Sequence, residues 1–388
     1  MPLGQTLGLP IGGGMSFRSN RGRRAGERMQ VDAVVIFRIG SLGDTVVALP
    51  CFHRVARSFP NARRILVTDI PASQKAAPVE SVLANSGLID RVIYFPQPPR
   101  GLRDLLNLRN EIRATMAQLV IYVADRSTLS TLRDLCFFRA CGIHHVIGAP
   151  LGRDLRQPRT DPVSGRTEHE AERLARCLAP LGPIDLNNRD FWDLRLQPSE
   201  VRAAEKCLVP LRGRGFVAVS IGGRVASKDW GDGNWAALFA LMATRYADLA
   251  LVFFGSADEF ERSGRFAARW PAPVLNLCGR LAPRESAAAM QRAWCFIGHD
   301  SGPLHLAAAT GVPCIGIFGN YNKPKWWHPM GRGHSIIHDM RGVREIAPQQ
   351  VHAAIRATLG SIAGQTSQTA LWSADRSRFT HAEAFTTD

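Results

Sequence analysis

The chain has 388 residues, 45% of them hydrophobic and 21% charged, and 48 basic against 33 acidic residues give a formal net charge of +15. This apolar content excludes a disordered protein, and the length predicts about two domains. No run of about 18 apolar residues is present, which argues against a membrane-spanning helix. The basic excess favours partners that carry phosphate: a nucleic acid, an anionic membrane surface or a phosphorylated ligand.

Neither the two ends of the chain nor the cysteines contain a motif that predicts a function. Residues 1–28 are rich in glycine and arginine and lack the apolar core of a secretory signal, so they predict a disordered basic tail, and Met29 is an alternative start. None of the eight cysteines pairs at CxxC spacing, which disfavours a zinc site or a disulfide framework and predicts buried cytosolic thiols.

Strands and helices alternate in the first half of the chain. The apolar run at 33–37 predicts a buried strand, and the loop at 38–44 follows it. Helical spacing predicts a helix at 45–59 that is kinked at Pro50. Further strands are expected near 65–68, 119–123 and 145–147, with helices near 102–116, 128–141 and 168–181. This alternation predicts a parallel sheet with both faces covered.

A second α/β series follows a connection at 182–200. Strands are expected at 216–220, 249–254 and 274–277, and helices at 235–245, 259–269, 283–292 and 351–359. The loop at 221–230 contains Gly222, Gly223, Arg224 and Lys228, and residues 320–334 form a basic and aromatic loop. Residues 364–388 are rich in Ser, Thr and Gln and are expected to be disordered.

The stretch 294–319 is the most informative part of the second series. It reads as a strand at 294–297, a turn at 299–303, a helix at 304–310 and a strand at 314–318, with Asp300 or Ser301 as helix cap. Free N–H groups at 301–304 would then lie at the positive end of a helix, where phosphate binds. The alternative is a well-capped helix of any α/β protein, but Gly302 and His305 in the first turn favour a ligand.

Both halves begin with a buried strand and a glycine-containing loop, which predicts two Rossmann-like domains facing each other across a cleft. Neither half contains GxGxxG or GxxxxGK[ST], which disfavours NAD enzymes and P-loop NTPases. We divide the chain into an acceptor-binding domain at 29–190, a linker at 191–212, a nucleotide-sugar-binding domain at 213–345, a terminal helix at 346–363 and a tail at 364–388. The names of the two domains rest on the resemblance described next.

Two motifs resemble those of the heptosyltransferases, family nine of the glycosyltransferases. Arg38-Ile-Gly-Ser-Leu-Gly-Asp44, followed by Leu49-Pro50, is similar to the family's N-terminal motif. Residues 300–308, Asp-Ser-Gly-Pro-Leu-His-Leu-Ala-Ala, followed by Gly-Val-Pro at 311–313, resemble its C-terminal signature. The resemblance covers roughly residues 31–360. It implies a GT-B fold and inverting transfer of a sugar, typically from ADP-L-glycero-D-manno-heptose, to a lipopolysaccharide core.

The resemblance assigns the catalytic roles to Asp44 and Lys228. Inverting transfer needs one base for the acceptor hydroxyl, and Asp44 at the end of its glycine-containing loop fits that role, with a helix cap as the alternative. The departing nucleoside diphosphate needs fixed donors or a metal. The sequence has no Asp-x-Asp pair, so Lys228 and the helix start at Ser301 and Gly302 are expected to replace a metal, and no cofactor is implied.

Other residues are expected to bind the two substrates. The donor-binding set on this resemblance is Gly223, Arg224, Lys228, Glu259, Leu281, Asp300, Ser301, Gly302 and His305. Asp258 and Glu261 remain alternatives to Glu259 for the ribose hydroxyls, and Leu281 stands where the family has an apolar contact to the base. The acceptor-binding set is Arg38, Ser41 and Gly43.

Departures from the family pattern leave alternatives open. Gly222, Gly223 and Arg224 stand where the family often has hydroxyl residues, and the loop at 320–329 does not map onto it. The donor is therefore ADP-heptose or another nucleotide sugar, and the alternatives are a sugar-nucleotide epimerase or a non-catalytic protein that binds anionic ligands. The expected partners are a nucleotide sugar, a glycolipid or lipopolysaccharide-core acceptor and an anionic membrane surface, without nucleic acid. The expected location is cytoplasmic, peripheral on the inner membrane.

Overall fold

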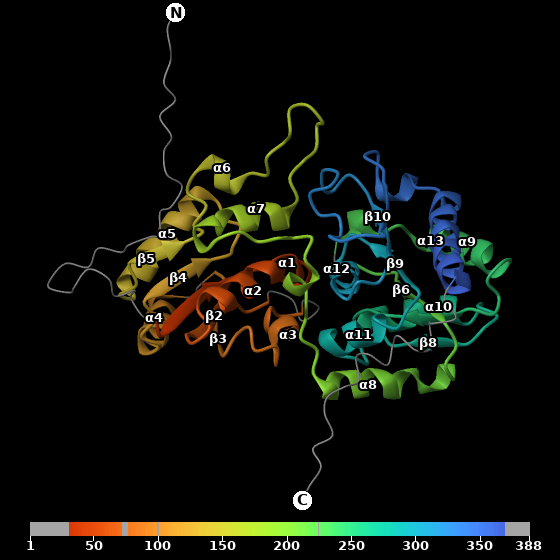
Figure 1. Ribbon diagram of the computed structural model, residues 1–388, viewed down its shortest axis with the longest axis horizontal. Coiled ribbons are helices and arrows are strands. Elements are labelled where there is room, and N and C mark those ends of the chain that lie inside the picture. The colour runs from red at the N-terminus through yellow and green to blue at the C-terminus, as the bar shows by residue number, and fades with distance from the viewer. Residues whose placement is uncertain (1–30, 72–76, 99–100, 224, 369–388) are drawn as a thin grey trace, which may run out of the picture.

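The computed structural model describes residues 31–71, 77–98, 101–223 and 225–368, and it consists of two α/β units that lie side by side (Figure 1). The predicted tail at 1–28, Arg224 and residues 369–388 lie outside the described residues. Within the described part of the chain, no helix has the length and apolar character needed to cross a membrane.

The N-terminal unit is built on a parallel five-stranded sheet with the order β3-β2-β1-β4-β5. The central strands are almost entirely buried, as their apolar runs predict. The strands are β1 (Ala33–Phe37), β2 (Arg63–Asp69), β3 (Arg91–Phe95), β4 (Leu119–Tyr122) and β5 (His145–Ile147).

Helices cover both faces of this sheet because successive strand residues point to opposite sides. Val34 and Ile36 face one core, with side chains of α1 (Leu42–Val47), α2 (Leu49–Ser58) and α7 (Glu170–Cys177). Val35 and Phe37 face the other core, with side chains of α4 (Leu102–Ala114) and α5 (Thr128–Ala140). The short helices of this unit are α3 (Glu80–Leu83) and α6 (Arg153–Arg156).

The C-terminal unit is a parallel six-stranded sheet with the order β11-β10-β9-β6-β7-β8. Its strands are β6 (Phe216–Ser220), β7 (Ala250–Phe253), β8 (Val274–Asn276), β9 (Cys295–His299), β10 (Cys314–Phe318) and β11 (Ser335–His338). Its helices are α9 (Asp232–Ala243), α10 (Phe260–Ala267), α11 (Pro283–Met290), α12 (Gly302–Ala309) and α13 (Pro348–Gln368).

One hydrophobic core runs across the boundary between the two units. It contains Leu49 and Phe52 of α2 as well as Leu304 and Ala307 of α12. A helix of the connection, α8 (Pro198–Leu208), packs against α11 of the C-terminal unit. The helices that follow β1 and β9, α1 and α12, also pack against each other, so the carboxyl ends of these two strands lie at the boundary of the units, where ligands of α/β proteins collect.

Several local expectations differ from the structure. The helix predicted at 45–59 is two helices separated at Ala48, because Pro50 has no N–H to continue the first one and instead occupies the start of α2. His299 belongs to β9 rather than to the turn. The predicted linker contains α8, and α13 continues to Gln368, past the predicted start of the tail at 364. Among the cysteines, Cys136 is exposed and Cys207 is half-buried, whereas the other six are buried.

Candidate active site

Asp44 lies in the first turn of α1, at the edge of the sheet where β1 ends. It is the third helical residue rather than the cap, and Ser41 occupies the cap position. Both the amide and the hydroxyl of Ser41 donate to Asp44 Oδ2, each at 2.7 Å. Gly40, at φ 140°, makes this turn possible, since a Cβ there would lie 2.8 Å from Asp44 Cβ.

The surroundings keep Asp44 ionised. Burial raises the pKa of its carboxyl, but the charge of Arg38, the two Ser41 hydrogen bonds and His305 outweigh burial and leave the pKa below its usual range. Within the described residues, only Oδ2 accepts hydrogen bonds, so Oδ1 remains able to take a proton.

Arg38 is buried, and two of its guanidinium nitrogens donate to the main chain, whereas its Nε has no partner among the described residues. Its Nη1 donates to Val123 O and its Nη2 to Asp44 O, both at 2.6 Å. These bonds hold β1, β4 and α1 together below the carboxylate. The predicted acceptor contact of Arg38 stays a prediction; in this geometry Arg38 also bonds the main chain of Asp44 and lowers the pKa of its carboxyl.

The first turns of α1 and α12 meet face to face across the boundary. A Cβ on Gly43 would lie 3.2 Å from the His305 ring, and a Cβ on Gly302 would lie 2.7 Å from Leu42 Cδ2. Glycine at these two positions allows the close approach that brings the Asp44 turn next to the predicted donor-binding turn. The buried His305 lies between them: burial lowers its pKa, and the carboxylates of Asp300 and Asp44 oppose that effect.

The start of α12 offers fewer free N–H groups than its sequence predicts. Ser301 is the cap residue, Pro303 has no N–H, and Leu304 N donates to Ser301 O at 3.2 Å. Among the described residues, the N–H groups of Ser301 and Gly302 have no hydrogen-bond acceptor. Two donors therefore remain for a phosphate oxygen at this helix end.

Lys228 and Asp300 form an ion pair on the donor side of the site. Lys228 Nζ lies 2.8 Å from Asp300 Oδ2, and Asn322 Nδ2 donates to the same oxygen at 2.7 Å. The ammonium also lies 4.3 Å from the centre of the Tyr321 ring. The sequence identifies Lys228 and Asp300 as site residues. The contacts of Tyr321 and Asn322 with this pair depend on the conformation of the loop after β10, which the sequence does not reveal.

Glu259 is held between the carboxyl ends of two adjacent strands. A Cβ on Gly222, after β6, would lie 1.7 Å from Glu259 Oε1, and a Cβ on Gly255, after β7, would lie 1.9 Å from Oε2. Ser256 N donates to Oε2 at 3.1 Å. Both glycines leave room for this carboxylate, and these contacts place Glu259 at the carboxyl ends of the two strands, which favours it over Asp258 and Glu261 for the predicted role.

The remaining predicted residues are placed less tightly. Leu281 is half-buried against the core shared by the two units, and Gly223 is exposed with open space around its Cα. Arg224 lies outside the described residues.

His299 is a residue of this region that the sequence analysis did not assign. It is fully buried at the end of β9, and its Nε2 accepts from Trp230 N at 3.2 Å. Trp230 in turn donates from its indole to Ile346 O at 2.8 Å. These contacts fix the loop that carries Lys228, and they were not visible from the sequence because they join residues far apart in the chain.

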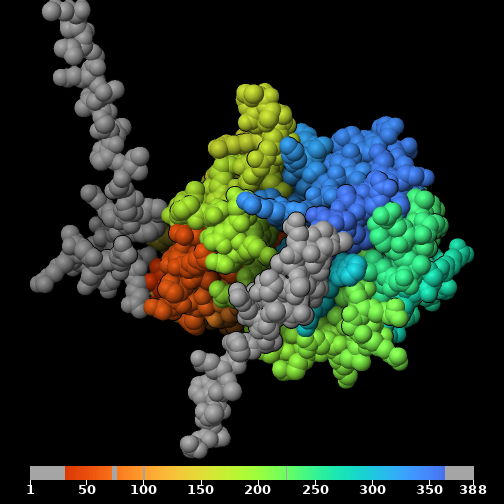
Figure 2. Space-filling view, turned by 45° about the vertical axis from the view of Figure 1, so that its right-hand side comes forward, coloured from red at the N-terminus to blue at the C-terminus, as the bar shows by residue number. Residues whose placement is uncertain are grey.

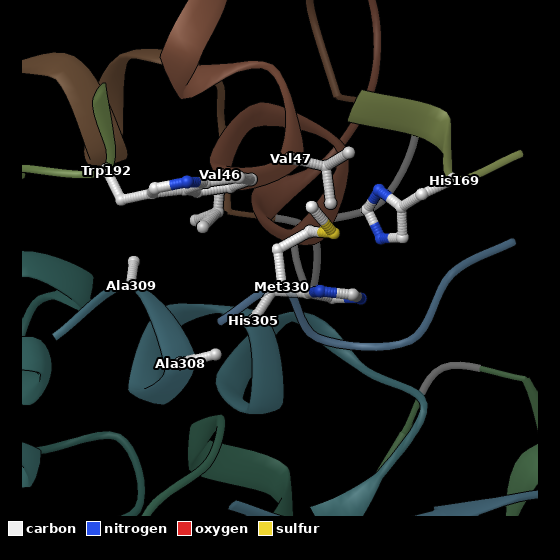
Figure 3. Close-up of a pocket in the computed structure, with 8 residues that line it drawn as sticks. All are labelled: Val46, Val47, His169, Trp192, His305, Ala308, Ala309 and Met330. Atoms are coloured by element: carbon white, nitrogen blue, oxygen red, sulfur yellow. The ribbon is translucent and has the colours of Figure 1, made fainter. Parts of the chain in front are cut away.

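A small cavity lies beside the turns of α1 and α12 at the boundary of the two units (Figure 3). Figure 3 shows the Met330 side chain pointing between α1 and α12. The lining residues are Val46, Val47, His169, Trp192, His305, Ala308, Ala309 and Met330. Both units contribute to this lining, which combines apolar side chains with the imidazoles of His169 and His305.

The family model that matches this chain is glycosyltransferase family 9 (heptosyltransferase), over residues 140–346. The chain belongs to this family. The match covers the donor-side residues Lys228, Glu259, Asp300 and His305, whereas Asp44 lies outside it. This glycosyltransferase therefore has its predicted donor residues inside the matched region, and the role of Asp44 rests on the N-terminal motif and the geometry.

Comparisons with individual proteins agree with that assignment. The chain is 30% identical over 310 residues to lipopolysaccharide heptosyltransferase 1 of Pseudomonas aeruginosa, covering 74% of this chain and 79% of that protein. A family 9 glycosyltransferase structure from Veillonella parvula aligns with TM-score 0.68 and 20% identity, over 86% of this chain and 100% of the other. The ADP-heptose lipopolysaccharide heptosyltransferase II of Escherichia coli aligns with TM-score 0.61 and 15% identity, over 85% and 99% of the two chains. These structures confirm the predicted GT-B fold.

Proposed function

We propose that this glycosyltransferase moves a heptose from ADP-heptose to a lipopolysaccharide core or a related glycan, with inversion at the anomeric carbon and without a metal. The observation that carries the proposal is the contact between the first turns of α1 and α12. It brings a half-buried, ionised carboxylate on one unit next to the proposed anion-binding turn on the other. The names of the relatives supply the donor and acceptor classes.

Asp44 is the proposed base. Its lowered pKa keeps the carboxylate ionised at neutral pH, and the two hydrogen bonds from Ser41 hold it in one orientation, while Arg38 donates to the main-chain oxygen of Asp44. As the acceptor oxygen attacks the anomeric carbon, Oδ1 takes the hydroxyl proton and the bond to the leaving phosphate oxygen breaks on the opposite face. A single base and a single displacement invert the configuration of that carbon.

Lys228 and the N-terminus of α12 are proposed to stabilise the leaving diphosphate. The Lys228 ammonium lies next to Asp300, one residue before the Ser301 and Gly302 N–H groups. Positive charge and fixed donors at this point offset the negative charge that develops as the sugar bond breaks. We propose metal independence because the Lys228 ammonium and the N–H groups of Ser301 and Gly302 would stabilise the diphosphate where a metal ion does so in other enzymes.

The nucleoside is proposed to bind at the carboxyl ends of β6 and β7. Glu259 offers a carboxylate oxygen to the ribose hydroxyls, and its other contacts hold it against Gly222 and Gly255. Leu281 would then contact the base. Gly223 and Arg224 remain proposed donor contacts of the same loop, and Ser41 and Gly43 remain proposed acceptor contacts.

The acceptor class also leads us to propose docking on an anionic membrane surface. Leu102 and Leu106 on α4, and Leu129 and Leu132 on α5, are exposed on two helices of the same face of the N-terminal sheet. Arginines of these helices lie among them, at positions 103, 133 and 139. Each arginine near such a surface contributes about 1 kcal/mol at low salt.

Sedimentation with vesicles tests the docking proposal. We expect binding to phosphatidylglycerol vesicles at low salt, weaker binding to phosphatidylcholine vesicles, and loss of binding in the double variant Leu102→Ser, Leu129→Ser. The control is Val209→Ser, which changes an exposed apolar residue outside α4 and α5. A protein that ignores anionic vesicles at low salt contradicts the docking proposal but not the transfer reaction.

Nucleotide release from a panel of sugar nucleotides tests the reaction. The assay is run in excess chelator, with and without a heptose-deficient lipopolysaccharide core, and the anomeric configuration of the product is read by NMR. We expect release from ADP-heptose that depends on the acceptor and gives an inverted product. Donor turnover without acceptor would indicate an epimerase, and binding without turnover would indicate a non-catalytic protein; either result contradicts the proposal.

A further inference from the structure

The loop after β10 connects the donor side of the site to the other unit of the protein. We call residues 320–330 the bridging loop. Its first part contacts the Lys228–Asp300 pair, and its last part contacts the start of α7 in the N-terminal unit. Figure 2 shows the blue segment of the C-terminal unit in contact with the yellow-green segment of the N-terminal one.

The donor-side end of the bridging loop supports the ion pair. Asn322 Nδ2 and Lys228 Nζ both reach Asp300 Oδ2, at 2.7 and 2.8 Å. A donor diphosphate would attract Lys228 away from this oxygen, and Asn322 would then continue to satisfy the buried carboxylate of Asp300. Asn322 thereby keeps Asp300 in place while Lys228 changes partner.

The other end of the loop is attached to a rigid part of the N-terminal unit. Glu170 N donates to Trp326 O at 3.0 Å, and Trp326 Nε1 donates to Glu170 Oε2 at 3.3 Å. His169 Nε2 lies 2.6 Å from His328 O. Glu170 is buried and is held by Arg173 through two hydrogen bonds of 2.8 and 2.5 Å, so the anchor has little freedom to move.

Only three residues, at 323–325, separate Asn322 from Trp326. One is Pro324, with a fixed φ, and another is Lys325, held at φ 71°. A displacement of the Trp326 anchor must therefore move Asn322, because the short connection has little slack.

We propose that Asn322 is a positioning residue for the Lys228–Asp300 pair, and that Trp326 makes this positioning depend on the contact between the two units. This inference rests on the proposed function, since it assigns Lys228 to the donor diphosphate. It adds that the donor site is complete only while the bridging loop is attached to α7.

Steady-state kinetics of single and double variants test the proposal. We expect Asn322→Ala to lower kcat by roughly tenfold or more, as for the loss of one hydrogen bond to a charged group, with the acceptor KM unchanged. Trp326→Phe keeps an aromatic side chain but loses the indole N–H that donates to Glu170, and we expect it to lower kcat although Trp326 lies outside the donor-binding set. The double variant is expected to be no slower than Asn322→Ala alone, because both changes act on the same contact.

Two control variants separate positioning from general damage. Lys323→Ala changes an exposed residue of the same loop, and Trp294→Phe makes the same replacement as Trp326→Phe elsewhere in the C-terminal unit. Both are expected to keep kcat. Equal effects of Trp326→Phe and Trp294→Phe, or additive effects of the Asn322 and Trp326 changes, overturn the proposal.

A spectroscopic measurement gives a result that does not depend on turnover. The indole signal of Trp326 in protein labelled with 5-fluorotryptophan is assigned by its absence in Trp326→Phe and is followed during titration with ADP. We expect it to shift on binding in the native protein and to shift less in Asn322→Ala. Binding of ADP without any shift overturns this inference alone, whereas failure of ADP and other nucleoside diphosphates to bind contradicts the proposed function as well.

Discussion

Arg284 of α11 joins the two units through a buried cluster of hydrogen bonds. Its guanidinium donates to Glu200 of α8 at 2.6 and 3.0 Å, and to the carbonyls of Val82, Leu194 and Arg195 at 2.7–2.8 Å. The side chain is 3% exposed and that of Glu200 is 11% exposed. Arg284→Ala removes the guanidinium from three carbonyls and from this carboxylate, which keeps only the hydrogen bond from Gln197 N.

We expect Arg284→Ala to lower the free energy of unfolding by about 3–5 kcal/mol, the usual cost of removing one partner of a buried ion pair. The same two helices offer a matched control, because Arg292, which follows α11, pairs with Glu205 of α8 at the surface. These side chains are 44% and 50% exposed, so Arg292→Ala is expected to cost less than about 1 kcal/mol.

Urea unfolding of the native protein and both variants, followed by tryptophan fluorescence, measures the difference. A second variant, Glu200→Gln with Arg284→Met, removes both charges and is expected to recover part of the stability, because no buried charge remains unpaired. Equal losses in Arg284→Ala and Arg292→Ala would refute the argument that burial sets the strength of the Arg284 cluster.

Three further predictions concern the site. Lys228→Met is expected to lower kcat by about 10²–10³-fold, as for the loss of one preorganised donor, measured as nucleotide release, and an unchanged kcat contradicts its role at the diphosphate. Gly302→Ala is expected to lower kcat, because the new Cβ meets Leu42 and separates the turns of α1 and α12. The control Gly360→Ala, at a position with open space around it, is expected to keep kcat. Equal rates in the two variants contradict the need for a close approach at Gly302. Burial lowers the pKa of His299 from 6.5 to about 4. As the pH falls below 6.5, the histidine is protonated in the unfolded chain but not in the folded protein. The free energy of unfolding therefore falls between pH 6.5 and pH 4, by about 3 kcal/mol. Urea unfolding between pH 7 and 4 measures this loss, which His299→Gln should reduce; an identical pH dependence in that variant refutes the assignment.

The fold was predictable because its signals are local. Buried runs such as 33–37 and 216–220 form the central strands, and the Asp-Ser-Gly-Pro turn at 300–303 begins α12 as expected. The edge strands β3 and β11 were missed: β3 contains the apolar run at 92–95, which was a usable strand signal, whereas β11 has only two adjacent apolar residues, and both strands are only partly buried. The start of α8 was also missed, although Pro198 at its first turn and Glu200 three residues after Gln197 are helix-start signals.

The candidate site could be predicted only in part. Asp44, Lys228 and Asp300 stand in motifs, so the sequence identifies them without knowledge of their neighbours. The contributions of Asn322 and His299 come from contacts with residues far away in the chain, and neither residue type signals such a contact. Arg38 was predicted as an acceptor contact from its motif, and the motif does not signal that its guanidinium also donates to two carbonyls of the main chain.

The central claim is that Asp44 is the base of an acceptor-dependent transfer. The most direct test compares acceptor-dependent release of ADP from ADP-heptose by the native protein and by Asp44→Asn, with donor binding measured separately. Asparagine keeps an oxygen that can accept from Ser41, so the turn of α1 is expected to persist. The account predicts unchanged donor binding and a loss of release of about 10²–10⁴-fold, the usual contribution of a general base. Equal release by the two proteins would contradict it and would leave Asp44 as a residue that only stabilises the start of α1.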